Sequence, residues 1–213
     1  MIDKKKAIFW DNDGVLVDTE KYYYEANRVI FENEGFVLTR EMYMEMTLVK
    51  GTGAWHFLDK AKYTDEKIVS LKNERDELYS QLILSGEILM PGIENVLTEL
   101  SQKYKMAIVT SSKPVHFEAI HSRTGLLKYF EFVITPNDYK NYKPHPEPYL
   151  TALAKMDVKN TEGIAVEDSR RGLLSAKAAG LECIVVKNEL TSTSDFTEAD
   201  CVLNEIREIT RLL

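Results

Sequence analysis

Short apolar runs alternate with helix-like segments from residue 91 onward, and this alternation predicts the fold. Each run has the length and composition of a buried strand, whereas apolar residues between the runs recur at helical spacing. The expected strands are 106–109, 132–134, 163–166, 183–186 and 201–203. Helices are expected at 91–104, 115–123 and 147–156, from the end of strand 163–166 to Gly180, and at the C-terminus after 203. Strands that alternate with helices favour a Rossmann-like α/β fold, in which a mostly parallel sheet carries helices on both faces.

An earlier apolar run, residues 7–10, is expected to join the same sheet. Residues 19–89 separate it from the other strands and have the pattern of a small helical bundle. The expected helices of this bundle are 20–34, 39–46, 54–63 and a long helix after Thr64, with Thr39 and Thr64 as caps. We therefore expect a core formed by 1–18 and 90–213, with 19–89 inserted as a helical cap domain that can act as a lid.

Polar side chains follow the strands where they end. Asp11 and Asp13 come directly after 7–10, and Gly14 permits the chain to turn at once. The other polar positions are Thr110, Ser111, Lys143, Glu167 and Asp168. Each of them also occurs in solvated turns, helix caps or surface loops. Because the carboxyl ends of parallel strands meet at one edge of a sheet, the set as a whole favours a ligand site.

This combination of side chains suits a metal ion and a phosphate group. Crowded carboxylates repel one another unless a cation lies among them, and hard oxygen ligands suit Mg²⁺. The Thr110 hydroxyl, a backbone N–H near Ser111 and the Lys143 ammonium can donate to phosphate oxygens. The residues therefore predict Mg²⁺-assisted phosphoryl transfer to an aspartate.

Composition narrows the class of protein. The 213 residues are 44% hydrophobic and 29% charged, as in an ordinary globular chain. A formal net charge of -7 argues against nucleic acid as a partner. We find no apolar stretch as long as a membrane span and no signal-peptide pattern, so we expect a cytoplasmic protein without a membrane partner. We expect it to be a monomer or a small homo-oligomer.

Four segments, in this order, resemble the motifs of the haloacid dehalogenase-like (HAD) superfamily: 11–20, 109–111, 143–144 and 166–169. The resemblance spans nearly the whole chain, and the helical insertion is similar to the small cap of that superfamily. It implies hydrolysis of a small phosphate monoester, such as a sugar phosphate or a similar metabolite, through an aspartyl-phosphate intermediate.

The resemblance also implies a role for each strand-end residue. Asp11 would be the nucleophile, and Asp13 would be the general acid and then the general base. Thr110 and the backbone at Ser111 would hold the phosphate, while Lys143 would neutralise both the nucleophile and the phosphate. The implied ligands of Mg²⁺ are Asp11, the main-chain carbonyl of Asp13, Glu167 and Asp168.

Departures from other members narrow the choice of reaction. Dehalogenases of the superfamily lack the second aspartate, so Asp13 argues against dehalogenation. The segment 14–20 and the cap most resemble the beta-phosphoglucomutase-like phosphatase branch. True mutases carry a histidine where 22–24 stand and an arginine near 50–54, and this chain has neither. A sugar phosphomutase and a non-catalytic phosphate-binding or interaction module remain the alternatives to a phosphatase.

The remaining expectations concern the substrate contact in the insertion, the residue between the two aspartates and the histidines. Substrate choice is expected to lie in the insertion, where Lys50 is the candidate contact. Asn12 stands where members of the superfamily are generally apolar, and exposure to solvent would account for it. His116, His121 and His145 lack the spacing of metal ligands and are interpreted as surface or helix residues.

Overall fold

The computed structural model of the chain describes residues 4–49, 52–58 and 63–213, which form two compact units. One unit combines Met1–Asp18 with Ile88–Leu213, and the other is Thr19–Glu87. Residues 88 and 89, expected in the insertion, belong to the first unit. The reason is backbone pairing: the Asp18 N–H donates to the Ile88 carbonyl at 2.8 Å, and Val17 forms an antiparallel bridge with Leu89.

The first unit is built on a parallel sheet with the strand order β3-β2-β1-β4-β5-β6. The strands are β1 (Ala7–Trp10), β2 (Lys105–Val109), β3 (Phe132–Ile134), β4 (Gly163–Glu167), β5 (Glu182–Val186) and β6 (Cys201–Leu203). β1 lies between β2 and β4, so the strand order reverses at β1. Such a reversal opens a crevice at the carboxyl ends of the strands, where ligands of open α/β sheets bind.

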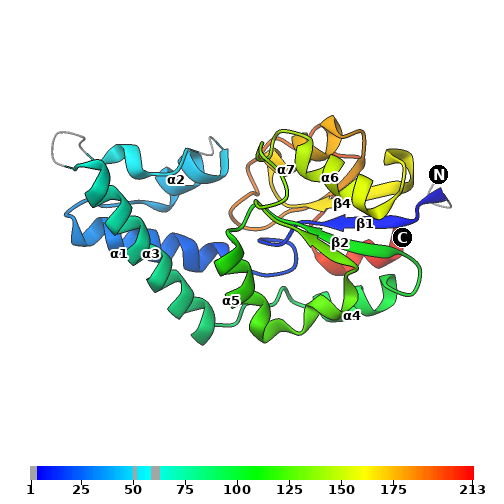
Figure 1. Ribbon diagram of the computed structural model, residues 1–213, viewed down its shortest axis with the longest axis horizontal. Helices are drawn as coiled ribbons and strands as arrows, with labels where there is room; N and C mark the ends of the chain where they lie inside the picture. Colours follow the sequence, from blue (N-terminus) through cyan, green and yellow to red (C-terminus); the bar gives the residue numbers. More distant parts are fainter. Residues whose placement is uncertain (1–3, 50–51, 59–62) are drawn as a thin grey trace. The chain divides into compact units, whose positions relative to one another are not determined.

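Helices cover both faces of this sheet, with α6 and α7 on one face and α4 and α5 on the other (Figure 1). Their bounds are α4 (Ile93–Leu100), α5 (Pro114–Thr124), α6 (Glu147–Met156) and α7 (Arg170–Ala178). Short 3₁₀ turns cover Leu126–Tyr129, Asn160–Glu162 and Ile206–Arg211. The last of them stands where a C-terminal helix was expected. The Rossmann-like fold predicted from the alternation of strands and helices is confirmed.

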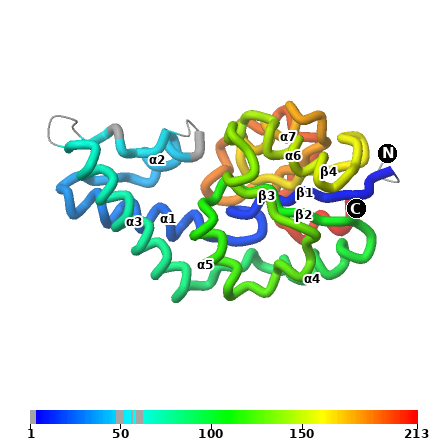
Figure 2. Tube along the Cα trace, in the orientation of Figure 1, coloured from blue at the N-terminus to red at the C-terminus, as the bar shows by residue number. Residues whose placement is uncertain are grey.

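The second unit is helical, and its trace can be followed in Figure 2. It contains α1 (Glu20–Asn33), α2 (Arg40–Tyr43), a π-helical turn (Met44–Val49), a 3₁₀ turn (Trp55–Phe57) and α3 (Asp65–Ser85). The hydroxyls of Thr39 and Thr64 cap α2 and α3, as expected, by accepting from backbone N–H groups. The expected helix 54–63 is present only as the 3₁₀ turn, and residues 59–62 lie outside the described residues.

This helical unit has its own core. Phe31, Tyr43 and Leu71 are buried in a cluster that partly covers Trp55. Arg75 is also buried, and its guanidinium donates to the Asn27 side chain at 3.1 Å. Because burial of apolar surface is the main stabilising contribution, this cluster is what holds α1 and α3 together.

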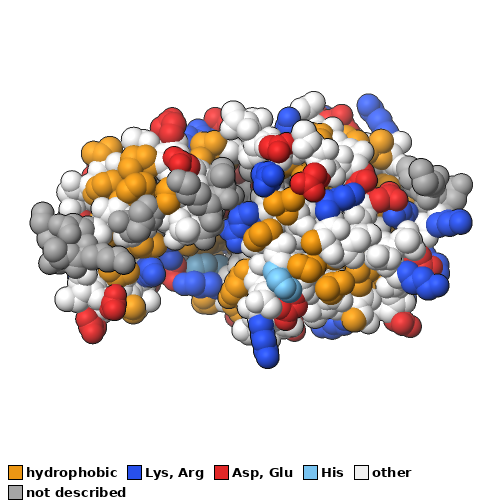
Figure 3. Space-filling view, turned by 90° about the horizontal axis from the view of Figure 1, so that it is seen from above, with side chains coloured by type: hydrophobic (Ala, Val, Ile, Leu, Met, Phe, Trp, Pro, Cys, Tyr) orange, Lys and Arg blue, Asp and Glu red, His pale blue; other side chains and the backbone are white. Residues whose placement is uncertain are grey.

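The distribution of charged side chains and the apolarity of the helices both bear on the expected partners. Acidic and basic side chains are intermingled over the face of the molecule in Figure 3. Among the described helices, none is both long enough and apolar enough to cross a membrane.

Truncation of Leu71 should unfold the protein much more readily than truncation of Leu84 on the same helix. Leu71 is 2% exposed and Leu84 is 54% exposed, and both lie on α3. Leu71→Ala should lower the free energy of unfolding by about 2–5 kcal/mol through lost burial and a residual cavity. Leu84→Ala should change it by less than about 0.5 kcal/mol. Chemical denaturation followed by circular dichroism measures both, and equal losses would contradict the assignment of the core.

Candidate active site

The carboxyl end of β1 sets the position of two aspartates. The four residues of β1 are fully buried, and the Asp11 N–H donates to the Val166 carbonyl at 2.9 Å, which extends the pairing with β4. The chain then turns sharply, because the Asn12 carbonyl accepts from the N–H groups of the next apolar residues: Val15, Leu16 and Val17. A buried strand followed by this turn leaves Asp11 and Asp13 at the edge of the sheet.

Gly14 permits the turn to pass close to the end of β4. Its φ is 83°, a conformation that favours glycine. A Cβ at this position would lie 2.1 Å from Oδ2 of Asp168 and 2.9 Å from the Asn188 amide nitrogen. The Asn188 amide in turn donates to Oδ2 of Asp168 at 2.7 Å. The turn that carries Asp13 therefore rests directly on Asp168.

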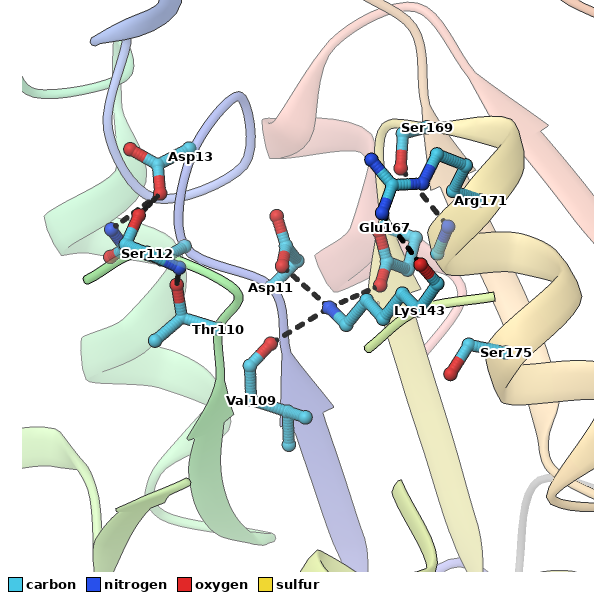
Figure 4. A network of polar contacts seen from close by, with 12 residues as sticks. Asp11, Asp13, Val109, Thr110, Ser112, Lys143, Glu167, Ser169, Arg171 and Ser175 are labelled. Carbon is cyan, nitrogen blue, oxygen red and sulfur yellow. Dashed lines mark hydrogen bonds and ion pairs between the residues drawn. The ribbon is translucent and has the colours of Figure 1, made fainter. Parts of the chain in front are cut away.

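Lys143 links the ends of three strands (Figure 4). Its Nζ donates to Oδ1 of Asp11 at 2.6 Å and to Oε1 of Glu167 at 2.7 Å. The third acceptor is the Val109 carbonyl at the end of β2, at 2.8 Å. With three acceptors around it, the buried ammonium is fully satisfied.

The loop that carries Lys143 is tied to α7. The Arg171 guanidinium donates to the Lys143 carbonyl at 2.6 Å (Figure 4). The Ser175 hydroxyl donates to the His145 carbonyl at 2.6 Å. Ser169 begins α7 as its N-cap, so the helix that follows β4 also fixes this loop.

Glu167 lies fully buried at the end of β4. Its Oε1 accepts from the Tyr149 hydroxyl at 2.5 Å as well as from Lys143. Burial and the neighbouring Glu167 raise the pKa of Tyr149 well above its ordinary value, so the hydroxyl stays protonated and donates. The carboxylate packs against Gly172, where a Cβ would lie 1.8 Å from Oε2. Only glycine leaves room for it.

The buried charges shift the titration of the nucleophile candidate and its partner. Burial raises the pKa of Asp11 to about 8, and Lys143 only partly offsets this effect, while Glu167 and Asp13 raise the pKa further. Burial alone would lower the pKa of Lys143, but Asp11 and Glu167 raise it above its ordinary value. Lys143 therefore remains a cation, and Asp11 sits where a proton or a further cation is favoured.

Three carboxylates form a candidate metal site. Asp11, Glu167 and Asp168 each offer an oxygen within 4.8 Å of the others. Among the described residues, the buried Oε2 of Glu167 has no hydrogen-bond partner. A set of hard oxygen donors, excess negative charge and an unsatisfied carboxylate oxygen all fit a divalent cation. Such an ion would favour the charged form of Asp11 and so oppose the effect of burial on its pKa.

The end of β2 supplies hydroxyl groups beside Asp13. Thr110 is buried, and its Oγ1 accepts from the Ser112 N–H at 3.0 Å. Ser111 is exposed at the edge of the sheet. The Ser112 hydroxyl donates to Oδ2 of Asp13 in a short contact. Ser112 was not among the expected site residues, although its place directly after Thr110 and Ser111 was a signal for it.

Asn12 and His121 differ from expectation. Asn12 is fully buried rather than exposed, and its Oδ1 lies 2.8 Å from Nε2 of His121. His121 does belong to a helix, α5, but it is buried, and burial lowers its pKa to about 4. This contact could not be anticipated from spacing, because 109 positions separate the two residues. Lys50, the candidate substrate contact, lies outside the described residues.

Comparison with known proteins places the chain in a family. Residues 8–186 match the haloacid dehalogenase-like hydrolases. Beta-phosphoglucomutase of Bacillus subtilis is 31% identical over 195 residues, covering 85% of this chain and 83% of that protein. The phosphorylated carbohydrates phosphatase of Thermotoga maritima is 29% identical, covering 96% of this chain and 99% of that one.

A solved structure agrees with these matches over both units of the chain. It is the crystal structure of CbbY from Rhodobacter sphaeroides in complex with phosphate, which has a TM-score of 0.82 and 28% identity and covers 96% of each chain. The family match extends over more than half of the sequence, and the relatives cover most of it. The chain therefore belongs to the haloacid dehalogenase-like hydrolases, in the branch that resembles beta-phosphoglucomutase.

Proposed function

We propose that this protein is a Mg²⁺-dependent phosphatase that hydrolyses a phosphorylated sugar or a similar small phosphate monoester through an aspartyl-phosphate intermediate. The observation that carries the proposal is the position of Lys143, whose ammonium lies 2.6 Å from Asp11 where the metal-site carboxylates converge. A metal site, a buried cation and a carboxylate at one sheet edge are what phosphoryl transfer to an aspartate requires.

In the first step, the Asp11 carboxylate attacks phosphorus, and the bond between phosphorus and the sugar oxygen breaks. Asp13 gives its proton to that oxygen, so the sugar leaves as a neutral alcohol. Thr110 and the backbone at Ser111 hold the phosphate oxygens in this proposal. Asp13, the proposed acid, stands two positions after the nucleophile Asp11 in the sequence, and its Oδ2 accepts from the Ser112 hydroxyl.

In the second step, water attacks the phosphorus of the aspartyl phosphate. Its proton passes to Asp13, inorganic phosphate leaves, and the Asp11 carboxylate is regenerated. The same residue thus serves as acid and then as base, which requires its carboxyl group to keep one position through both steps.

Lys143 reduces the repulsion between two anions. A carboxylate about 4 Å from a phosphate charge is repelled by roughly 4 kcal/mol at an effective dielectric constant of about 20, close to a thousandfold in rate. The ammonium lies between Asp11 and Glu167 and offsets this repulsion. Mg²⁺ would be held by Asp11, Asp168, the Asp13 carbonyl and Glu167, directly or through water, and when bound it supplies the remaining positive charge.

The names of the relatives support a phosphorylated carbohydrate as the substrate class. They also include a mutase, so the choice between hydrolysis and isomerisation needs its own measurement. A panel of sugar phosphates assayed with MgCl₂ should release inorganic phosphate. Interconversion of sugar phosphate isomers that exceeds hydrolysis in the presence of a sugar bisphosphate would contradict the phosphatase assignment.

Asp11→Asn should abolish phosphate release from every substrate in that panel. The amide is a poor nucleophile, so turnover should fall by at least about a thousandfold. Asp65→Asn makes the same change at an exposed position on α3 and should leave turnover unaltered. Undiminished turnover in Asp11→Asn, or no turnover in the wild type on any substrate, would overturn the proposed function.

Mg²⁺ should bind more weakly as the pH falls below 8. The pKa of Asp11 is raised to about 8, so at lower pH the ion has to displace a proton from this ligand. The apparent Kd should rise by up to about tenfold for each pH unit below 8 and level off above it.

Isothermal titration calorimetry with MgCl₂ between pH 6 and pH 9 measures this dependence. Asp11→Asn, whose amide does not titrate, should show a flatter profile. A wild-type Kd that is the same at pH 6 and pH 8 would refute the role of Asp11 as a titrating ligand.

A further inference from the structure

Asn12 is a polar side chain with no exposed surface, placed between the two aspartates of the site. The proposed chemistry gives it no role. A buried amide is retained at little cost only where its donors and acceptors are satisfied. Its two partners are Asp13, whose Oδ2 lies 3.2 Å from Nδ2, and His121, whose Nε2 lies 2.8 Å from Oδ1.

The chemistry of these groups fixes the direction of each hydrogen bond. The amide NH₂ of an asparagine only donates, so Nδ2 of Asn12 donates to Oδ2 of Asp13, and Oδ1 of Asn12 faces the histidine. Nε2 of His121 must then carry the proton. Nδ1 is left as an acceptor, and it lies 2.8 Å from the hydroxyl of Thr124, which donates to it.

The end of α5 anchors this chain of hydrogen bonds. The hydroxyl of Thr124 accepts from the Leu126 N–H at 3.3 Å, where Gly125, with φ 63°, ends the helix. The direction is therefore the same throughout, from a backbone N–H through Thr124, His121 and Asn12 to Asp13. Hydrogen bonds aligned in one direction polarise and strengthen one another.

The ring of His121 is also held by packing. It lies against Phe117, one turn earlier on α5, with ring centroids 4.3 Å apart. Because burial lowers the pKa of His121 to about 4, the ring is neutral at neutral pH, as the hydrogen-bond directions require. A rigid neutral donor is well suited to orient an amide, because it does not change charge when the neighbouring acid takes up or loses a proton.

We propose that Asn12 and His121 are positioning residues that hold the carboxyl group of Asp13 in the orientation from which it protonates the leaving oxygen. This inference rests on the proposed function, since it assigns Asp13 the role of acid. The Ser112 hydroxyl holds Oδ2 from one side, and the Asn12 amide holds it through a chain anchored in α5. Both residues act through Asp13, which Asn12 contacts directly and His121 contacts only through Asn12.

Four variants and one matched control separate positioning from stability. Asn12→Leu and His121→Phe each keep the approximate size of the side chain but break the link. The first variant leaves Nε2 of His121 without its partner, and the second leaves Oδ1 of Asn12 and the hydroxyl of Thr124 without theirs. The double variant Asn12→Leu/His121→Phe removes both polar groups, so stability should recover relative to the single variants. His121→Gln keeps a donor near the position of Nε2. His116→Phe makes the same change at another buried histidine of α5 and is the matched control.

The readout is kcat/KM for two substrates whose leaving groups differ in basicity. An alkyl phosphate such as glucose 6-phosphate needs protonation of its leaving oxygen, whereas 4-nitrophenyl phosphate does not. Misplacement of the acid should lower kcat/KM for the alkyl phosphate by about 10–100-fold in Asn12→Leu, His121→Phe and the double variant. In the same three variants, the loss for the aryl phosphate should stay below about threefold. In His121→Gln and His116→Phe, the loss should stay below about threefold with both substrates.

The outcomes distinguish three explanations. If the double variant recovers both its melting temperature and its activity on the alkyl phosphate, the link is only structural, and the inference is wrong. Equal losses on both substrates also overturn it. If the wild type hydrolyses neither 4-nitrophenyl phosphate nor any sugar phosphate of the panel, or if Asp11→Asn hydrolyses them as well as the wild type does, the proposed function fails instead.

A measurement without catalysis tests the same link. In ¹⁵N-detected NMR at pH 7, the His121 ring should be neutral with its proton on Nε2, and the signal is assigned by its loss in His121→Phe. A proton on Nδ1 would reverse the direction of the chain, so the Asn12 amide could no longer donate to Asp13. That result would sink the inference irrespective of the kinetics.

Discussion

The ammonium of Lys143 is the charge on which the arrangement of the site depends. It donates to the buried carboxylate of Glu167, the partly buried carboxylate of Asp11 and a backbone carbonyl, which stand at the ends of three different strands. Without it, two neighbouring carboxylates, one of them fully buried, would lack this counter-charge, and an uncompensated buried charge is strongly destabilising. The ties from α7 to the Lys143 loop therefore stabilise the sheet edge as well as the site.

The Lys143 ammonium leaves room in the charge balance of the site for a metal ion. One positive charge does not balance the carboxylates at this edge. Burial is the main cause of the raised pKa of Asp11, and the neighbouring Glu167 and Asp13 raise it further. A divalent ion would balance it while leaving Lys143 in place, since the lysine occupies Oδ1 of Asp11 and Oε1 of Glu167. The stability of the sheet edge and the proposed binding of phosphate would then be two results of one charge distribution.

Much of the fold was predictable because each apolar run of the core forms a buried strand. Residues buried on both faces of a parallel sheet must be apolar throughout, and the chain must become polar where the strand ends, as at Asp11 and Glu167. The burial of Asn12 was not predictable in this way. Its environment depends on His121, 109 positions away, and on how α5 ends. The division at residue 88 likewise follows from a backbone contact with Asp18, which no pattern of side chains reveals.

Backbone pairing joins the two ends of the inserted segment, where Asp18 pairs with Ile88 and Val17 with Leu89. This pairing affects how easily the insertion can be exchanged for another. The chain leaves the sheet unit and re-enters it at neighbouring points, so the two ends of the insertion are already close together. A short turn could join them with little loss of loop entropy. Exchange of one inserted segment for another therefore leaves the strands of the sheet and their order untouched. Hydrolases built in this way can diversify by segment replacement, without any change in the residues at the strand ends.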